Sequence, residues 1–220
     1  MHRFNYLCSI ILVITLPLMI VILSSNLILR VSATYVFHFN DSQVISEVPY
    51  NIEGTEFADA IASYWSSFDD EPFQIYEDNG LFQDKVFDED EQAVMKKAKH
   101  VLNIELAVGA ACLLLSAGIY LYLLKSGFGA ALRNRYKICV GVTIGLFIMQ
   151  LICWFRKGFR VWLYNYFIGI SLHKDSVLAL ILGDPAFKTY MLFATIFGAG
   201  ILAILSYIHY SVTRPNNMFY

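Results

Sequence analysis

The sequence has few charged residues and no excess of either sign. Only 15% of its 220 residues are charged, against about 25% in an average soluble domain. The formal net charge is −2, from 16 basic and 18 acidic residues, so the chain lacks the basic excess that nucleic-acid binding requires. The low charged fraction argues against an ordinary soluble domain, and the balanced net charge argues against a nucleic-acid partner.

Motifs of the common soluble enzymes are also missing. The four cysteines form neither a CxxC pair nor a Cys/His metal-binding spacing, so neither a disulfide framework nor a metal site is predicted. The sequence contains no G-x-S-x-G, Walker loop, H-E-x-x-H or dinucleotide fingerprint. No cofactor is therefore predicted.

Hydrophobic residues make up 57% of the chain and gather in long runs. A helix needs about 20 apolar residues to cross a hydrocarbon core of about 30 Å. Four runs approach or exceed this length: Tyr6–Leu29, Val101–Leu124, Ile138–Phe155 and Tyr190–Val212. The first is longer than the apolar region of about 7–15 residues in a secretory signal, which indicates an uncleaved span.

Two shorter apolar stretches, Val161–Leu172 and Val177–Leu182, lie between the third and fourth runs. They are too short to span a bilayer and predict a re-entrant or interfacial pair. With the N-terminus inside, six Lys and Arg residues flank the inner ends of the spans and nine flank the outer ends. This count slightly favours the inverted orientation, so charge alone leaves the orientation open.

The one sizeable polar region, residues 31–99, contains 15 of the 18 acidic residues. Alternation in Ala33–Asn40 predicts a strand with Tyr35, Phe37 and Phe39 on one face. The stretch Thr55–Phe68 predicts a helix capped by Thr55, because its large apolar residues recur at helical spacing. They are Phe57, Ile61, Tyr64, Trp65 and Phe68.

Two further local signals follow in this region. Asn79-Gly80 between Phe73–Tyr76 and Leu81–Phe87 predicts a β-hairpin, because both central residues of such a turn need positive φ. Asp88 followed three residues later by Glu91 has the pattern of a capping box. It predicts a helix that begins there and continues unbroken into the second span.

These signals predict a mainly α fold: a polytopic membrane protein with four transmembrane helices and a small extracytoplasmic α+β segment between spans one and two. The predicted organisation is a first transmembrane helix at 1–30, an acidic extracytoplasmic segment at 31–99, and a three-helix membrane region at 100–220. The last of these includes the re-entrant or interfacial segment at 158–186. Such a chain is expected to be a multi-pass protein.

Several residues near the predicted membrane boundary could carry chemistry. His100 and His173 adjoin apolar segments at the same boundary and would make an acid/base pair if they met, the alternative being two solvated side chains at helix ends. Glu105 lies inside the second span, where a carboxylate is costly unless it faces a polar cavity or stays in the headgroup zone. Both placements of Glu105 remain open.

A basic cluster, Arg156, Lys157 and Arg160, follows the third span among aromatic residues. Cations suit lipid phosphates and amphipathic rings suit the membrane boundary, so this cluster and Glu105 are predicted to contact lipid, simple anchoring being the alternative. A Gly141-x-x-x-Gly145 motif in the third span would permit close helix contact.

The layout and one local motif resemble the lipoprotein intramolecular transacylase (Lit) family of four-span bacterial membrane proteins. The stretch Phe87-Asp88-Glu89-Asp90-Glu91-Gln92-Ala93-Val94-Met95 is similar to the family's pattern of a Phe, a Glu and a His-Met pair entering the second span. The family's histidine falls on Val94. A second family histidine, in a Phe-His segment ahead of an Asn-Asp pair, falls near Ile168 ahead of Lys174-Asp175, with His173 as a displaced counterpart.

The resemblance implies transfer of the sn-2 acyl chain of a lipoprotein's diacylglyceryl group to its N-terminal amine, with the N-terminus inside and a bacterial cell membrane as the location. Such a reaction needs a base, an acid and oxyanion donors. The predicted catalytic residues are His100 and His173 as acid and base, with Glu91 or Asp175 as orienting carboxylates. A membrane lipid or a lipoprotein is the predicted partner.

Two other readings stay open. Valine and isoleucine cannot move protons, so the chain could be a non-catalytic protein, either a pseudoenzyme or an accessory subunit. Its acidic outer segment would then bind a protein partner through the Phe57, Ile61 and Phe68 face. A small transporter component is a weaker alternative, because only Glu105 and His209 supply ionisable groups inside the spans.

Overall fold

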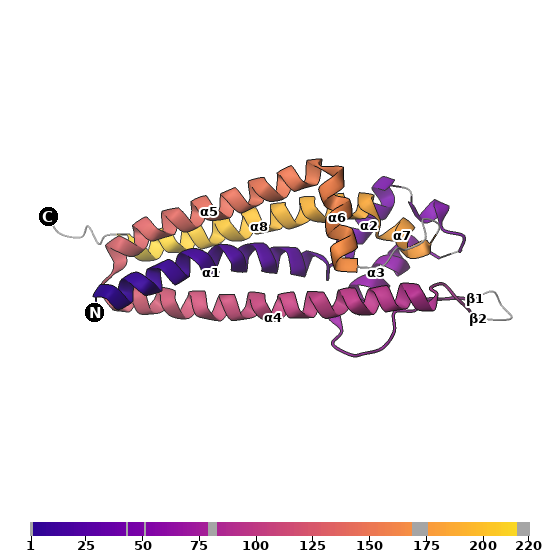
Figure 1. Ribbon diagram of the computed structural model, residues 1–220, viewed down its shortest axis with the longest axis horizontal. Coiled ribbons are helices and arrows are strands. Elements are labelled where there is room, and N and C mark those ends of the chain that lie inside the picture. The colour runs from indigo at the N-terminus through magenta and orange to yellow at the C-terminus, as the bar shows by residue number, and fades with distance from the viewer. Residues whose placement is uncertain (1, 43, 51, 79–82, 169–175, 215–220) are drawn as a thin grey trace. The chain divides into compact units, whose positions relative to one another are not determined.

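The computed structural model describes residues 2–42, 44–50, 52–78, 83–168 and 176–214. Almost every element is a helix (Figure 1). The helices are α1 (His2–Ile28), α2 (Ser32–Ser42), the 3-10 helix η1 (Val44–Glu47), α3 (Gly54–Ser66), α4 (Glu89–Lys125), α5 (Gly129–Phe155), α6 (Lys157–Ile168), α7 (Val177–Ile181) and α8 (Asp184–Thr213). Two short strands, β1 (Tyr76–Asp78) and β2 (Gln83–Lys85), lie between α3 and α4.

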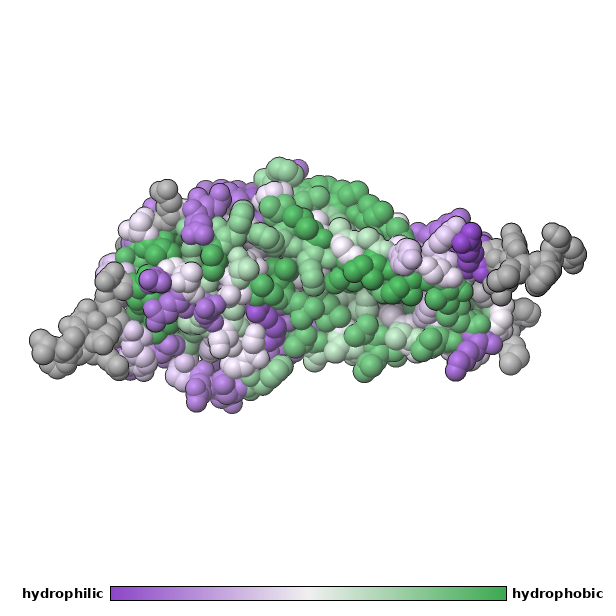
Figure 2. Space-filling model, turned by 180° about the vertical axis from the view of Figure 1, so that it is seen from behind, coloured by the Kyte–Doolittle hydropathy of each residue, from purple (hydrophilic) through white to green (hydrophobic). Residues whose placement is uncertain are grey.

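Four of these helices are long and apolar enough to cross a membrane, as the four apolar runs predict. Within the described residues they are Arg3–Ile28, Glu89–Lys125, Gly129–Phe155 and Pro185–Thr213. Large apolar side chains on them face outward, with Leu114 and Tyr207 each 74% exposed, and Figure 2 shows apolar residues over much of one face. A soluble protein does not expose so much apolar surface, so the chain is a multi-pass membrane protein.

The chain divides into two compact units. Unit 1 consists of Met1–Ser24, Leu106–Gln150 and Ala194–Tyr220, and unit 2 consists of Ser25–Glu105 and Leu151–Phe193. Unit 1 therefore contains most of the four long helices, whereas unit 2 contains their remaining ends and all of the short elements.

Unit 1 is held together by apolar packing with a few polar links. Leu12, Leu123, Leu132 and Cys139 are fully buried in its core. His209 Nδ1 of α8 and the Tyr120 hydroxyl of α4 share a hydrogen bond of 2.8 Å. The same imidazole stacks on the Tyr136 ring of α5 at 3.9 Å between ring centroids.

Glycine permits close helix contact in unit 1, but not at the predicted motif. A Cβ on Gly198 would lie 2.5 Å from the Phe147 ring, and one on Gly109 would lie 2.6 Å from Leu23. A Cβ on Gly141 or Gly145 would meet no atom within 4 Å. The predicted close approach at the Gly141-x-x-x-Gly145 motif is therefore wrong within the described residues, because both positions face open space.

The core of unit 2 is built on one face of α3. Phe57 is fully buried and meets the Phe87 ring edge-on at 6.3 Å between centroids. Ile61, Tyr64 and Trp65 are also buried, as their helical spacing predicts. Phe68 was expected on the same face but is 74% exposed, because α3 ends at Ser66.

Two further predictions about the outer segment are wrong. Ala33–Asn40 lies in helix α2, not in a strand, because Tyr35 and Phe39 are four residues apart and share a helical face as readily as a strand face. α2 packs against α3. Thr55 is not the N-cap of α3: that position is Glu53, which makes no capping hydrogen bond through its side chain.

The predicted hairpin is present, with Tyr76 paired antiparallel to Lys85 and Asp78 to Gln83. Its turn, Asn79-Gly80, lies outside the described residues. Because these three-residue strands are the β-structure of residues 31–99 in the described part of the chain, the segment is helical with a small hairpin, and the α+β description is not supported.

Candidate functional site

Glu91 lies in the first turn of α4 and ties the start of that helix to α7. Its Oε2 accepts a hydrogen bond from the backbone N–H of Asp88 at 3.0 Å, and Asp88 Oδ1 accepts one from the N–H of Glu91 at 2.7 Å. This is the predicted capping box. The other oxygen, Oε1, accepts from the backbone N–H of Leu178 in α7 at 2.9 Å. The predicted orienting carboxylate is thus 3% exposed and bound by two backbone N–H groups.

Of the two histidines predicted as acid and base, the structure describes one. His100 is exposed on α4. His173 and the second predicted orienting carboxylate, Asp175, lie outside the described residues. The meeting of His100 with His173 therefore stays a prediction.

The predicted lipid-binding cluster divides into exposed and buried members. Arg156 and Lys157 are exposed where α5 gives way to α6. Arg160 is 5% exposed, and its guanidinium donates to the carbonyl of Trp154 in the last turn of α5. Arg156 and Lys157 keep the exposure that contact with lipid phosphates needs, whereas Arg160 stabilises the end of α5.

Glu105 faces neighbouring helices of unit 2. Its side chain is half-buried and lies close enough to the Asn26 side chain of α1 for the two to interact. It also lies close enough to Tyr190 of α8 for the two side chains to interact electrostatically. The Tyr190 hydroxyl donates to the carbonyl of Ser25 at 2.8 Å. Of the two placements left open by the sequence, the structure favours a carboxylate directed between helices.

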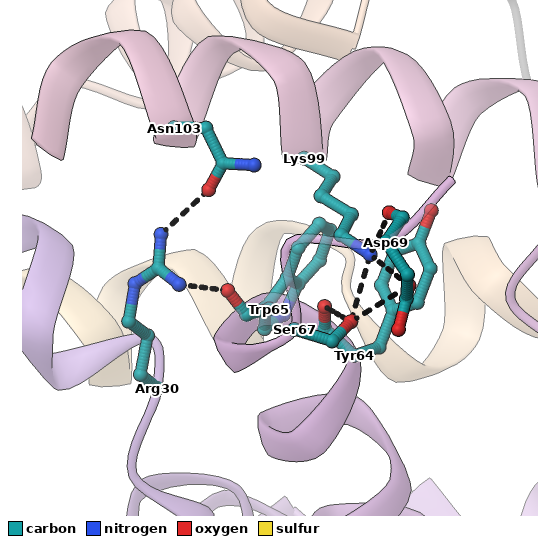
Figure 3. Close-up of polar contacts among 7 residues, drawn as sticks. All are labelled: Arg30, Tyr64, Trp65, Ser67, Asp69, Lys99 and Asn103. Atoms are coloured by element: carbon teal, nitrogen blue, oxygen red, sulfur yellow. Dashed lines mark hydrogen bonds and ion pairs between the residues drawn. The ribbon is translucent and has the colours of Figure 1, made fainter. Parts of the chain in front are cut away.

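Asn26 and Arg30 extend this polar network. Asn26 is fully buried, and its Nδ2 donates to the carbonyl of Leu102 at 2.6 Å. Arg30 Nε donates to Asn26 Oδ1 at 3.0 Å, and a terminal nitrogen donates to Asn103 Oδ1 at 3.0 Å. A second terminal nitrogen of Arg30 donates to the carbonyl of Trp65 (Figure 3). Burial lowers the pKa of the Arg30 guanidinium.

Lys99, one helical turn before Asn103 on α4, forms a second cluster with the chain that follows α3 (Figure 3). Its Nζ donates to Ser67 Oγ at 2.8 Å and contacts Asp69 Oδ1 at 2.9 Å. It also lies 4.3 Å from the centroid of the Tyr64 ring. The hydrogen bond from Lys99 lowers the pKa of Asp69, and burial raises the pKa of Tyr64 to about 12.

Arg30 and Lys99 together hold the end of α3 against α4. Arg30 donates a hydrogen bond to the Trp65 carbonyl, and Lys99 donates one to the Asp69 carbonyl at 2.8 Å. Positive charge suits a helix C-terminus, where backbone carbonyls lack intrahelical donors. The two cations thus have a structural role within unit 2.

His38 is a buried histidine that no sequence pattern indicated as a site residue. It is 2% exposed on the inner face of α2, and its Nε2 has no hydrogen-bond partner in the described part of the chain. Burial lowers the pKa of His38, while the Asp41 carboxylate and the Ile181 carbonyl act in the opposite direction. A helical reading of residues 32–42 would have directed His38 inward beside Thr34 and Tyr35.

Asn26 and Arg30 were also missed by sequence reasoning. Asn26 is a polar side chain near the end of the first apolar run, and this placement is the signal that could have selected it. Its partners, Leu102 and Arg30, could not be read from the sequence, because one of them lies 76 residues away.

Val94, the position matched to a family histidine, lies in the apolar core. It is 1% exposed, next to Met95, which is equally buried. The side chain of Ile168, matched to the second histidine, is not among the described side chains. The structure therefore supplies no imidazole at the first position, and that position is closed to solvent.

Comparison with solved structures gives matches over nearly the whole length of both chains. The chain is similar to the membrane integral lipoprotein intramolecular transacylase Lit from Bacillus cereus, with a TM-score of 0.79, 14% identity and 100% of each chain covered. A histidine-to-alanine variant of that protein matches at a TM-score of 0.75 and 15% identity, over 99% of this chain and 97% of the other. A histidine-to-arginine variant matches at 0.72 and 15%, over 99% and 95%.

No protein-family model matches the sequence, and no curated protein is similar to it at a significant level. The chain therefore shares the fold of this transacylase over its whole length, as the layout of its apolar runs predicts. A sequence identity of 14% supports a shared fold and nothing further.

Proposed function

We propose that this protein acts on the lipid anchor of lipoproteins in a bacterial cell membrane, moving an acyl chain from the diacylglyceryl group to the N-terminal amine. The observation that carries the proposal is the fold likeness to a lipoprotein transacylase over the full length of both chains, at a TM-score of 0.79. The likeness includes the short elements of unit 2 as well as the four long helices, since nothing of either chain is left uncovered.

In this proposal the reaction takes place on unit 2. Arg156 and Lys157, both exposed, would contact lipid phosphates. His100 and His173 would serve as acid and base for the ester and the amine, with Asp175 as an orienting carboxylate. Glu91 would act indirectly, by holding the start of α4 against α7, because its carboxylate accepts hydrogen bonds from the N–H groups of Asp88 and Leu178.

The test is mass spectrometry of lipoprotein N-termini from a bacterium that lacks transacylase activity, with and without this protein. Expression is expected to convert diacylglyceryl lipoproteins to a lyso form that carries an acyl chain on the N-terminal nitrogen. A His100→Gln, His173→Gln double variant should abolish the conversion, whereas Lys97→Gln, an exposed neighbour on α4, should not. Unchanged lipoproteins on expression of the intact chain would refute the proposal.

A second function, a non-catalytic protein that binds a lipoprotein or a protein partner, is favoured by Val94. The position matched to a family histidine is apolar and 1% exposed, so it cannot move a proton. Phe68, which is 74% exposed within the acidic segment 31–99, offers a contact for a partner.

This alternative predicts a different pattern of variants. Phe68→Ala should abolish the ability of the protein to complement a deletion strain. The double histidine variant should still complement it. The opposite pattern would refute the non-catalytic reading.

A further inference from the structure

Unit 1 carries positive charge that none of its own residues balances. Its three segments contain neither aspartate nor glutamate. They contain six lysine and arginine residues: Arg3, Lys125, Arg133, Arg135, Lys137 and Arg214. The one ion pair in the described part of the chain joins Lys99 to Asp69, and both of these belong to unit 2. Within the described residues, the cations of unit 1 therefore have no carboxylate partner.

These cations gather where four helix ends of unit 1 meet. The Phe4 ring at the start of α1 meets the Tyr122 ring near the end of α4 edge-on, at 5.7 Å between centroids. The Tyr122 hydroxyl donates to Asn5 Oδ1 at 3.1 Å. Near the start of α5, Arg133 donates to the carbonyl of Thr213 at the end of α8. Since α5 directly follows α4 along the chain, all six cations lie at the same end of unit 1.

Arg135 is the cation that a neighbouring side chain holds in place. Its guanidinium lies 4.9 Å from the centroid of the Tyr6 ring of α1, in a cation–π contact. Within the described residues it makes no hydrogen bond and no ion pair, so its N–H donors are available. Arg3 lies three residues before Tyr6, on the same face of α1. A planar guanidinium fixed over a ring presents its donors in the geometry that matches two oxygens of a phosphate.

The apolar side chains beside these cations favour a lipid as the partner. Leu121 of α4 and Tyr210 of α8 are exposed. Lys125 and Arg214 lie four residues further along the chain, which is about one helical turn. Cations one turn beyond the outward apolar side chains of membrane-spanning helices lie at the edge of the hydrocarbon, close to the lipid phosphates. A soluble acidic partner would leave the adjoining apolar surface uncovered.

We propose that this end of unit 1 binds the phosphate of an anionic phospholipid, with Arg135 as the phosphate-binding residue and Tyr6 as the ring that positions it. A zwitterionic lipid carries its own cation, whereas an anionic lipid brings the negative charge that unit 1 lacks. The site is separate from the predicted lipid contacts of Arg156 and Lys157, which belong to unit 2. It is also independent of the proposed acyl transfer.

The first experiment measures lipid binding to the full chain in a neutral detergent by native mass spectrometry. The probe is dioleoyl phosphatidylglycerol, and dioleoyl phosphatidylcholine is the zwitterionic reference. An Arg156→Gln, Lys157→Gln background removes the other predicted contact. Phosphatidylglycerol should bind more tightly than phosphatidylcholine, and Arg135→Gln should weaken its binding about fivefold. Lys97→Gln, exposed on α4 in unit 2, should not. Equal binding of the two lipids, or unchanged binding by Arg135→Gln, would overturn the inference.

Substitutions that keep the charge separate lipid binding from the role of basic residues in membrane orientation. Tyr6→Leu removes the ring beneath the guanidinium and should weaken phosphatidylglycerol binding about threefold, whereas Tyr6→Phe keeps the ring face and should bind as the intact chain does. Arg135→Lys keeps the charge and loses the planar donors, so it should also bind more weakly. Normal binding by both Tyr6→Leu and Arg135→Lys would show diffuse attraction in place of a site, and the inference would be wrong.

Photo-crosslinking in nanodiscs locates the bound lipid. Phosphatidylglycerol with a photoreactive headgroup should label peptides from residues 2–10 and 122–137, and this labelling should decline in Arg135→Gln. Inorganic phosphate, added at constant ionic strength, should leave the labelling unchanged. Loss of labelling to inorganic phosphate would show that the site takes the free ion, and labels confined to unit 2 would place the lipid elsewhere. Either result would overturn the inference.

Discussion

Glu91 provides a test of whether a predicted catalytic residue is a structural link. Its carboxylate accepts hydrogen bonds from the N–H groups of Asp88 at 3.0 Å and Leu178 at 2.9 Å. The perturbation is Glu91→Ala, with Glu91→Gln as a partial change. Glu89→Gln is the matched control, because Glu89 lies in the same helical turn and is exposed.

The cost of Glu91→Ala follows from the two hydrogen bonds. The N–H of Leu178 is buried, so leaving it without an acceptor costs about 1–3 kcal/mol. The N–H of Asp88 can be reached by water, since Asp88 is exposed, and losing that cap costs about 1 kcal/mol. The sum is about 3 kcal/mol. Glu91→Gln keeps one acceptor and places an amide donor against the other N–H, so about half of that cost is expected.

Thermal unfolding in detergent, followed by tryptophan fluorescence, measures the difference. Trp65 is 4% exposed in the same core and reports on its integrity. For a chain of this size, about 3 kcal/mol corresponds to a fall of roughly 6–12 °C in Tm. The expected order of Tm is wild type and Glu89→Gln, then Glu91→Gln, then Glu91→Ala.

Amide hydrogen exchange locates the effect. Glu91→Ala should remove protection at Leu178 in α7, and Glu89→Gln should not. An unchanged Tm together with unchanged exchange in α7 would refute the link between α4 and α7. If Glu91→Gln instead abolished acyl transfer while keeping Tm, the carboxylate would have the orienting role that the sequence predicts.

Three further predictions concern other parts of the structure. Lys99→Met removes three polar contacts of a side chain that is 5% exposed and should cost about 2 kcal/mol in thermal unfolding, whereas Lys97→Met, exposed on the same helix, should not. Burial lowers the pKa of His38 from its ordinary value of 6.5, so the unfolded state takes up a proton first and stability should fall as pH drops below about 6.5. His38→Phe should remove this slope in pH-dependent unfolding, and a slope that persists would contradict the assignment. Gly198→Ala should lower Tm, because its Cβ would lie 2.5 Å from Phe147, while Gly200→Ala, which meets no atom within 4 Å, should not.

The four spans were predictable because the bilayer imposes a length and a composition that any sequence must show. The capping box was also predictable, because Asp88 and Glu91 lie three residues apart and the hydrogen bonds are local. The second partner of Glu91 was not, since Leu178 lies 87 residues further along the chain.

Residues 33–40 show where a local pattern is ambiguous. Three aromatic residues at every second position suit a strand, yet Tyr35 and Phe39 are also one helical turn apart. Packing against α3 selects the helix, which turns Phe37 outward to 49% exposure and His38 inward. Because the spacing in residues 33–40 was interpreted as that of a strand, sequence reasoning missed both helix α2 and its buried residue His38.

The candidate site was predictable in its residue types but not in its connections. Glu105 stands out as a carboxylate inside an apolar run. Its place beside Asn26, and the hydrogen bond from Asn26 to the Leu102 carbonyl, come from the contact between the ends of α1 and α4 within unit 2. A single sequence contains no information on which polar residues of two spans will meet.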